Sequence, residues 1–385
     1  MKKQLLILAL IASCSVFAQK LKIRLLTNLS SATVIFTPLA GDYKVKLDTT
    51  LLNVDNGSNV YQLAAEGDSI EIKSFEKSIG KCKKIFFEST VKDGSFKLKS
   101  VTPETKVKTY DDDLEVTVTP SGLKLINKVD IEDYIAGVVE SEAGSRSTPE
   151  YYKLQSILCR TYALSNLRKH EPDSFNLCDQ VHCQAYKGKT ENTAVIAAVA
   201  DTKGLVIVDD DLNLISAAFH SNCGGQTVNS EDVWSLSASY LRSVKDTFCL
   251  RMPNAHWQKK IPKADWFSYL SLKQKYPVED SVSYYKAISF PQANGRETFL
   301  VSNDLKIPLK NIRSDWQLKS TYFSIQQQND TVVFNGRGYG HGVGLCQEGA
   351  MRMAQLGISY KNIVEYYYTK VHLVDLAVLS FLRED

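Results

Sequence analysis

The sequence predicts an α+β protein, with mixed helices and strands around a groove and an N-terminal β-rich region. Residues 20–125 contain short runs in which apolar and polar residues alternate, the pattern of half-buried strands. Residues 129–164 instead repeat their apolar positions with the 3.6-residue period of helices. Strand-like and helix-like stretches then alternate to the end of the chain. This mixture, without a regular βαβ repeat, is typical of the α+β class.

Composition and the first residues indicate an exported globular protein. The chain has 385 residues, 44% hydrophobic and 23% charged, with a net charge of +3. A charge so close to neutral gives no reason to expect a nucleic-acid partner. Lys2-Lys3, the apolar run Leu5–Ala12 and Val16-Phe17-Ala18 together resemble a signal peptide over residues 1–18. We therefore expect a periplasmic or cell-envelope protein; lipidation at Cys14, which follows a lipobox-like run, is the alternative.

The N-terminal region, residues 19–104, is expected to be a separate or half-separate β structure. Its strand-like runs include LKIRLL, ATVIFTPL, YKVKLD, KIFFEST and SFKLKSV. A carbohydrate-binding module is an alternative interpretation, but no aromatic stripe supports it. Two further runs, LEVTVTP and GLKLINK, lead into the helical stretch that begins at Val129.

The helical stretch places one carboxylate, Glu142, at a helix end. Ile131, Ile135, Val138 and Val139 define the apolar face of a first helix, and a second helix follows the break near Gly144. Ser147 or Thr148 is expected to cap the second helix, because Pro149 suits a first-turn position. A carboxylate that is half withdrawn from water has a raised pKa and can act as a general acid. The alternative is a solvated helix-end glutamate. Arg160 in the second helix either contacts Glu142 or substrate, or forms a structural ion pair.

After these helices we expect a helix over residues 191–202 and a hairpin formed by 205–208 and 214–219. Residues 256–334 alternate between helix-like and strand-like pieces. The glycine-rich run GRGYGHGVGLCQEGA, residues 336–350, is expected to open onto a helix. It lacks the spacing and the lysine of a P-loop.

Two histidines and two cysteines lie within fourteen residues: His170, Cys178, His182 and Cys183. This donor set suits tetrahedral zinc, and four protein ligands would make the site structural. A Cys178–Cys183 disulfide is the competing interpretation, because exported proteins meet an oxidising compartment. Cys159, on the apolar side of its helix, is expected to be a buried free thiol.

Four separated motifs resemble the SpoIID/LytB family of exported bacterial proteins that act on peptidoglycan. IEDYIAGVVESEAG and LQSILCRTYAL resemble the family signature, and CQAY, HSNCGGQT and GYGHGVGLCQEGA resemble later segments. The resemblance covers about residues 105–372, so a SpoIID-like catalytic domain is expected over 105–385. This chain has Ala143-Gly144 where the family usually has Met-Pro.

The resemblance implies a lytic transglycosylase that cleaves glycan strands between N-acetylmuramic acid and N-acetylglucosamine and leaves a 1,6-anhydro end. Glu142 matches the family's catalytic glutamate, and no cofactor is required for this chemistry. The family zinc site of some members is similar to the His170, Cys178, His182 and Cys183 set. Candidate substrate-binding residues, by position in these motifs and by their hydrogen-bonding groups, are Arg160, Gln184, Tyr186, Ser221, Gln226, His341 and Gln347.

Other interpretations remain open at this point. Some family members are described as enhancers of a cell-wall amidase, so the chain could bind peptidoglycan strands without cutting them. A purely structural envelope protein is a third hypothesis. His341 is either a groove residue or a turn residue, and a Cys346/His341 nucleophile pair is disfavoured because no orienting acid is evident. Cys223 and Cys249, each beside a family-like segment, are expected to form a disulfide.

Overall fold

The computed structural model describes residues 20–52, 60–74, 77–234, 236–292, 295–302 and 305–383. The chain divides into two compact units, Met1–Tyr134 and Ile135–Asp385, and each is described by itself. The division falls later than the boundary expected at residue 104, because three further strands belong with the first unit. The expected signal peptide and the lipidation alternative at Cys14 lie outside the described residues. No helix in the described part of the chain is long and apolar enough to cross a membrane.

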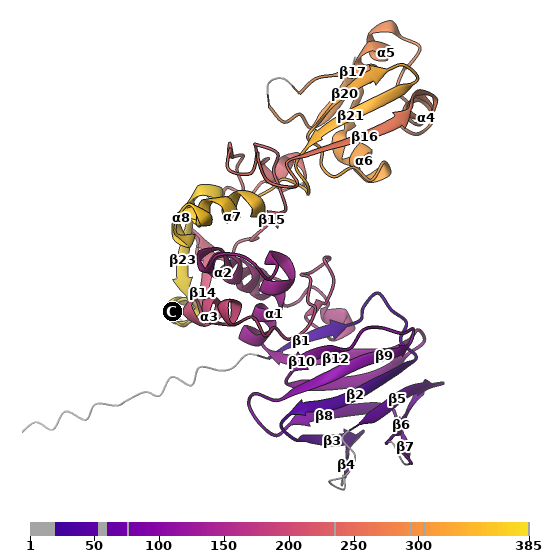
Figure 1. The fold of residues 1–385 in the computed structure, drawn as a ribbon, viewed down its shortest axis with the longest axis vertical. Coiled ribbons are helices and arrows are strands. Elements are labelled where there is room, and N and C mark those ends of the chain that lie inside the picture. Colours follow the sequence, from indigo (N-terminus) through magenta and orange to yellow (C-terminus); the bar gives the residue numbers. More distant parts are fainter. Residues whose placement is uncertain are drawn as a thin grey trace, which may run out of the picture. The chain divides into compact units, whose positions relative to one another are not determined.

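The first unit contains two antiparallel sheets (Figure 1). One runs in the order β1-β12-β11-β8-β3-β4, and the other in the order β10-β9-β2-β5-β6-β7. The strands are β1 Lys20–Leu25, β2 Thr33–Ala40, β3 Tyr43–Leu47, β4 Thr50–Leu52, β5 Tyr61–Glu66, β6 Ser69–Lys73, β7 Ser78–Cys82, β8 Lys84–Ser89, β9 Ser95–Thr102, β10 Lys108–Asp111, β11 Asp113–Thr119 and β12 Gly122–Asp130. The alternating runs are thus confirmed as strands, and their buried residues alternate as expected for sheets with one face in the core.

Aromatic side chains join the inner faces of the two sheets. The ring of Phe36 on β2 stacks on Phe87 of β8, with centroids 3.9 Å apart, and also on Phe96 of β9, at 5.0 Å. All three rings are fully buried. Since β2 and β8 belong to different sheets, the stacked rings form the centre of a sandwich core.

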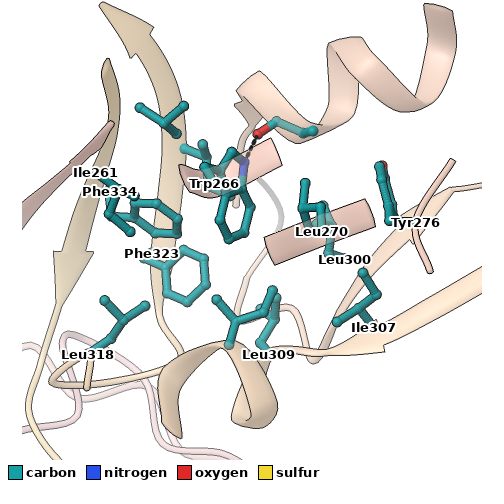
Figure 2. Packing of buried hydrophobic residues seen from close by; sticks show 14 residues of the cluster. Ile261, Trp266, Leu270, Tyr276, Leu300, Ile307, Leu309, Leu318, Phe323 and Phe334 are labelled. Atoms are coloured by element: carbon teal, nitrogen blue, oxygen red, sulfur yellow. Dashed lines mark hydrogen bonds between the residues drawn. The ribbon is translucent and has the colours of Figure 1, made fainter. Parts of the chain in front are cut away.

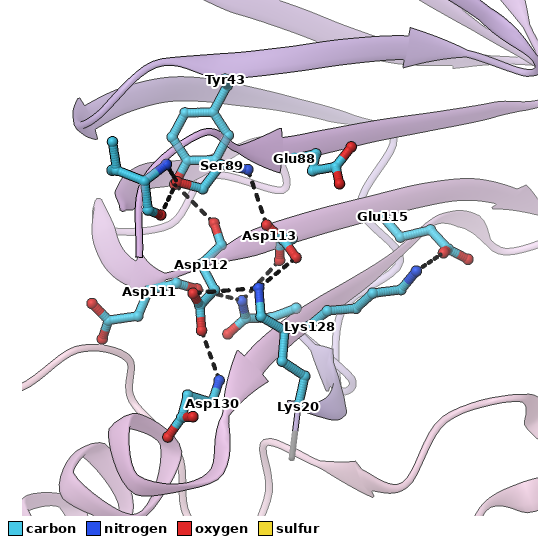
Figure 3. Close-up of polar contacts among 12 residues, drawn as sticks. Lys20, Tyr43, Glu88, Ser89, Asp111, Asp112, Asp113, Glu115, Lys128 and Asp130 are labelled. Carbon is cyan, nitrogen blue, oxygen red and sulfur yellow. Dashed lines mark hydrogen bonds and ion pairs between the residues drawn. The ribbon is translucent and has the colours of Figure 1, made fainter. Parts of the chain in front are cut away.

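A cluster of charged side chains in the first unit surrounds the end of β12, the strand that leads into helix α1 (Figure 3). The ammonium group of Lys20 lies 2.8 Å from Asp113 and 3.4 Å from Asp112. The backbone N–H of Asp130 donates to Asp112 Oδ2 at 2.7 Å. Asp130 Oδ1 in turn accepts from the backbone N–H of Glu132, at the start of helix α1 (Ile131–Ala143). Asp112 and Asp130 therefore fix the residue at which this helix begins.

The second unit is built on helix α2 (Pro149–Ser165), which packs against helices and a strand. Those neighbours are α3 (Thr193–Asp201), α7 (Gln347–Gln355), α8 (Tyr360–Tyr367) and β14 (Leu205–Asp209). Of the two expected caps, Ser147 and Thr148, the structure has Thr148, and Pro149 occupies the first turn as predicted. The central position of α2 explains why eleven of its residues are buried.

The hairpin expected over residues 205–219 forms only in part. β14 is joined to the segment that follows it by a bridge between Val208 and Leu214. Along its whole length it pairs instead with β23 (Val371–Asp375), which is followed by helix α9 (Leu376–Arg383). β15 (Phe219–His220) instead pairs in parallel with β22 (Leu345–Cys346). The strand that pairs with β14, β23, lies more than 160 residues further along the chain, so a local sequence pattern could not identify it.

Between these segments lies a small subdomain with its own core (Figure 2). Its main sheet has the order β16-β21-β20-β17. Trp266 is fully buried at the centre, and its indole N–H donates to the carbonyl of Ala287 at 2.9 Å. The elements are β16 His256–Pro262, α4 Lys263–Ser268, a π-helical turn Tyr269–Lys273, α5 Ser281–Ile288, β17 Ser289–Phe290, β18 Phe299–Ser302, β19 Leu305–Pro308, α6 Leu309–Asp315, β20 Phe323–Gln328 and β21 Thr331–Arg337.

Candidate functional site

Glu142 lies in the last turn of α1 and is half-buried. Its Oε1 accepts a 2.9 Å hydrogen bond from the backbone N–H of Ala185. Burial raises the pKa of this carboxyl group, while the Ala185 hydrogen bond and the charge of Lys187 oppose the shift. None of the described hydrogen bonds involves Oε2. One oxygen is therefore fixed by the protein, and the other remains available.

The helix ends directly after Glu142 because the backbone turns at Gly144. Gly144 has φ of +74°, in the left-handed region that glycine tolerates, and its N–H donates to the carbonyl of Glu140. The hydroxyl of Tyr152 donates to the carbonyl of Gly144 at 3.0 Å and accepts from the N–H of Ser147 at 3.0 Å. Tyr152 on α2 thus holds the break between the two helices. The turn at Gly144 therefore keeps the Glu142 carboxylate at a helix end, although this chain has Ala143-Gly144 where the family usually has Met-Pro.

The segment that donates to Glu142 approaches α1 closely at Gly137. A Cβ atom at Gly137 would lie 2.3 Å from the carbonyl oxygen of Gly188 and 2.6 Å from the ring of Tyr186. The hydroxyl of Ser141 accepts a second backbone bond, from Lys187, at 3.1 Å. Gly137 and Tyr152 were not identified from the sequence. A glycine inside an apolar helix was the available signal, because it often marks a close backbone approach.

Three candidate substrate residues lie in the interior. Arg160 is fully buried, and its guanidinium donates to the carbonyl of Leu205 at 3.1 Å. Gln184 donates to the carbonyl of Cys159 at 3.4 Å. Tyr186 packs on Gly137, as described above. Each of the three has at most 2% of its surface exposed, so their described contacts are structural.

The two histidines and two cysteines near α2 form one group, here called the His–Cys cluster: His170, Cys178, His182 and Cys183. Their ligand atoms all lie within 4.8 Å of one another. His170 Nε2 is 3.3 Å from Cys183 Sγ, and His182 Nδ1 is 3.8 Å from each of the two sulfurs. Both cysteines are free thiols. Two imidazoles and two thiols at these separations suit a tetrahedral zinc ion.

The two glycine-rich segments, 220–227 and 336–344, pack directly against each other. The backbone groups of Asn222 and Tyr339 exchange hydrogen bonds at 3.0 and 2.8 Å. Gly224 and Gly338 both have positive φ, and a Cβ at Gly338 would lie 2.5 Å from the carbonyl oxygen of Asn222. The described role of these glycines is therefore to let two loops approach each other. We call this pair of segments the double loop.

His341 is a turn residue of the double loop. Its Nδ1 accepts from the N–H of Val343 at 3.1 Å, and its Nε2 lies 3.0 Å from the carbonyl oxygen of Phe219. Nε2 therefore carries the proton. Burial lowers the pKa of His341 to about 4, so the ring is neutral at physiological pH. The Cys346/His341 nucleophile pair has no support here, because backbone groups occupy both ring nitrogens.

The remaining candidates also lie in or beside the double loop. Ser221 and Gln226 are partly exposed, and Gln226 donates to Ser243 at 3.1 Å. Gln347 opens α7 and is 9% exposed. Ser221 and Gln226 therefore keep surface that a ligand can reach.

A second group of ligating side chains lies under the double loop, here called the Cys–Asp cluster: Cys223, Asp246, Cys249 and Cys346. All four residues are buried, and their ligand atoms lie within 4.8 Å of one another. The expected Cys223–Cys249 disulfide is absent, since the sulfurs are 3.4 Å apart and both thiols are free. Sequence reasoning did not group Asp246 or Cys346 with this pair, because the fold brings them together from distant segments.

Tyr151 connects this region electrostatically with Glu142. The side chain is fully buried on α2 and donates to Gln155 at 3.2 Å. Burial raises the pKa of Tyr151 well above its ordinary value, and charges on Cys159, Cys346 and Glu142 act in the same direction.

These features define an α+β protein with one half-buried carboxylate at a helix end. Residues 119–208 match the protein family SpoIID, described as "Stage II sporulation protein". Stage II sporulation protein D of Bacillus subtilis (strain 168) is 30% identical over 63% of this chain and 74% of that protein. A protein of Brachyspira hyodysenteriae without an assigned function is 30% identical over 65% of this chain and 68% of its own. The amidase enhancer of B. subtilis is 27% identical, over 61% of this chain and 39% of that protein. The chain belongs to the SpoIID/LytB family.

Proposed function

We propose that this protein is an exported lytic transglycosylase that cleaves peptidoglycan glycan strands, with Glu142 as its catalytic residue. Membership of a cell-wall related family supports the class of substrate. The observation that carries the proposal is the state of Glu142: burial raises its pKa, one oxygen is held by Ala185, and the other has no described partner. A carboxyl group in this state can hold a proton and then deliver it.

The reaction needs only one such group. Protonated Glu142 gives its proton to the glycosidic oxygen between N-acetylmuramic acid and N-acetylglucosamine as the bond from that oxygen to the anomeric carbon breaks. The resulting carboxylate takes the proton of the muramic acid 6-hydroxyl as this oxygen attacks the same carbon. The product is a 1,6-anhydro end, no water is consumed, and Glu142 is protonated again. Hydrolytic glycosidases, in contrast, generally use two carboxylates. We expect peptide-stripped glycan to be the preferred substrate.

A zinc ion in the His–Cys cluster is proposed to support this site without joining the chemistry. Four protein ligands complete a tetrahedral shell and leave no open position. Cys183 lies two residues before Ala185, whose N–H holds Glu142. Lys169 also donates to the carbonyl of His182, at 2.6 Å. Zinc bound to these ligands would therefore stabilise the segment that positions the catalytic carboxylate.

The similarity to an amidase enhancer favours one alternative. In that case the protein would bind peptidoglycan and enhance a cell-wall amidase, and the carboxylate of Glu142 would not be required. Either function takes place outside the cytoplasm, in agreement with the expected export.

Digestion of purified glycan strands, with and without stem peptides, tests the catalytic proposal. The wild type should give anhydro-ended fragments by mass spectrometry, whereas Glu142→Gln should lose about 10²–10⁴-fold in rate, because it can hold no transferable proton. Glu140→Gln is the matched control, since Glu140 is on the same helix turn and should be dispensable. Binding without fragments from the wild type would support the amidase-enhancer alternative and contradict catalysis.

A further inference from the structure

The Cys–Asp cluster brings together three segments that are far apart in the sequence. Cys223 lies in the first half of the double loop, Asp246 and Cys249 lie in the following loop, and Cys346 immediately precedes α7. Cys223 Sγ is 3.4 Å from Cys249 Sγ and 3.3 Å from Asp246 Oδ2. Three thiols and a carboxylate therefore point at one small buried volume.

This geometry fits a single tetrahedral metal ion. With zinc–sulfur bonds of about 2.3 Å, ligand sulfurs at the corners of a tetrahedron lie about 3.8 Å apart. With a zinc–oxygen bond of about 2.0–2.2 Å, a sulfur and an oxygen ligand lie about 3.5–3.7 Å apart. The observed sulfur–sulfur separation of 3.4 Å and sulfur–oxygen separation of 3.3 Å reach these values with small side-chain shifts. A four-iron cluster binds each thiolate to a different iron atom and would need the sulfurs further apart. Thiolates favour zinc or copper(I), and the carboxylate oxygen favours zinc of the two.

The surrounding groups orient the four ligands as an outer shell does in metal sites. Asp246 Oδ1 accepts from the N–H of Phe248 at 2.9 Å, and Oδ2 accepts from the hydroxyl of Tyr367 at 2.8 Å. Cys346 Sγ accepts from the backbone N–H groups of Cys223 at 3.2 Å and Gly349 at 3.4 Å. N–H groups directed at sulfur stabilise a thiolate.

Three further features suit a buried anionic site. A Cβ at Gly349 would lie 2.3 Å from both Asp246 Oδ2 and the Tyr367 hydroxyl, so only glycine lets the carboxylate approach the start of α7. The positive end of the α7 dipole also lies at Cys346. The guanidinium of Arg296 donates to the carbonyl of Cys223 at 3.4 Å, which brings a positive charge close to the cluster.

We propose that Cys223, Asp246, Cys249 and Cys346 bind a structural zinc ion, separate from any zinc in the His–Cys cluster. Binding releases the thiol protons, and the four protein ligands complete the metal's coordination. The ion would tie both halves of the double loop to the first turn of α7. This proposal does not depend on the catalytic function of Glu142.

Metal analysis of the full chain, purified without chelator, tests the proposal. The variant His170→Ala/His182→Ala removes the nitrogen ligands of the His–Cys cluster and isolates the second site. We expect it to retain one equivalent of zinc, and X-ray absorption should show three sulfur ligands and one oxygen. Adding Asp246→Asn should weaken zinc retention in a chelator competition by at least about tenfold. Adding Cys82→Ser instead should leave it unchanged, because Cys82 is a buried thiol of the first unit.

Three results would overturn the proposal. The double histidine variant would contain no zinc, or its zinc would have nitrogen ligands. Alternatively, mass spectrometry of freshly purified wild type would show a Cys223–Cys249 disulfide in place of metal-protected thiols. Because wild-type protein serves for this last measurement, the test stands even if the variants fold poorly.

Discussion

The His–Cys cluster and the Cys–Asp cluster have similar ligand separations but are built differently. The first takes all four residues from positions 170–183, and His182 is exposed. The second collects its residues from positions 223–346, and all four are buried. A local set of ligands can be recognised as a sequence motif, whereas a dispersed set depends on the fold. The difference also implies that the dispersed cluster contributes more to tertiary stability.

The strongest test of this comparison is Cys346→Ser, which replaces a ligand of the buried cluster. We expect the free energy of unfolding to fall by about 4 kcal/mol or more, because a metal and its link between distant segments are lost together. Chemical denaturation followed by circular dichroism measures the change. Cys159→Ser controls for loss of a buried thiol on the same unit, and an equal effect of the two substitutions would contradict a special role for Cys346.

Gly338→Ala tests the packing of the double loop above this cluster. We expect a loss of about 3 kcal/mol, since alanine there adds both positive-φ strain and a clash with the carbonyl of Asn222. Gly357→Ala is the matched control, with φ of +83° but nothing within 4 Å of the added Cβ. It should cost about 1 kcal/mol. Equal melting temperatures for the two variants would show that the loops yield easily.

His182→Ala should have a smaller effect on stability, of about 1 kcal/mol, because the residue is exposed and its cluster joins only neighbouring segments. The same substitution should lower the zinc content by one equivalent and speed hydrogen exchange at the Ala185 amide. Exchange measured by NMR or mass spectrometry reports this directly. Unchanged exchange at Ala185 after zinc loss would separate the His–Cys cluster from the positioning of Glu142.

The smallest expected effect concerns pH. A general acid must be protonated, so kcat/KM should fall as pH rises through the pKa of Glu142; burial extends activity above the range of an ordinary glutamate. Lys187→Gln removes a charge that lowers this pKa. The alkaline limb should therefore move to higher pH, and less so at high salt. A shift to lower pH would contradict the assigned acid.

The success of sequence reasoning differed between elements for physical reasons. Alternation in the first unit identified β2 and β9, because strand faces depend on adjacent residues. The cap of α2 was narrowed to Ser147 or Thr148 for the same reason, and the structure has Thr148. The pairing expected for β14 with the segment that follows it is confirmed only at the Val208–Leu214 bridge, since pairing with β23 depends on the packing of the whole unit. The Cys223–Cys249 disulfide was wrong for a related reason: Asp246 and Cys346 complete the group.

The sequence by itself determined the α+β class, the helix end at Glu142 and the grouping of His170, Cys178, His182 and Cys183, because each depends on residues that are close together in the chain. Only the tertiary structure decided that Ala185 holds Glu142, that the two glycine-rich segments form one double loop, and that three cysteines meet an aspartate beneath it. These contacts join residues that are tens to more than a hundred positions apart. They form because burying the surrounding apolar side chains brings those segments together, and no local pattern encodes that outcome.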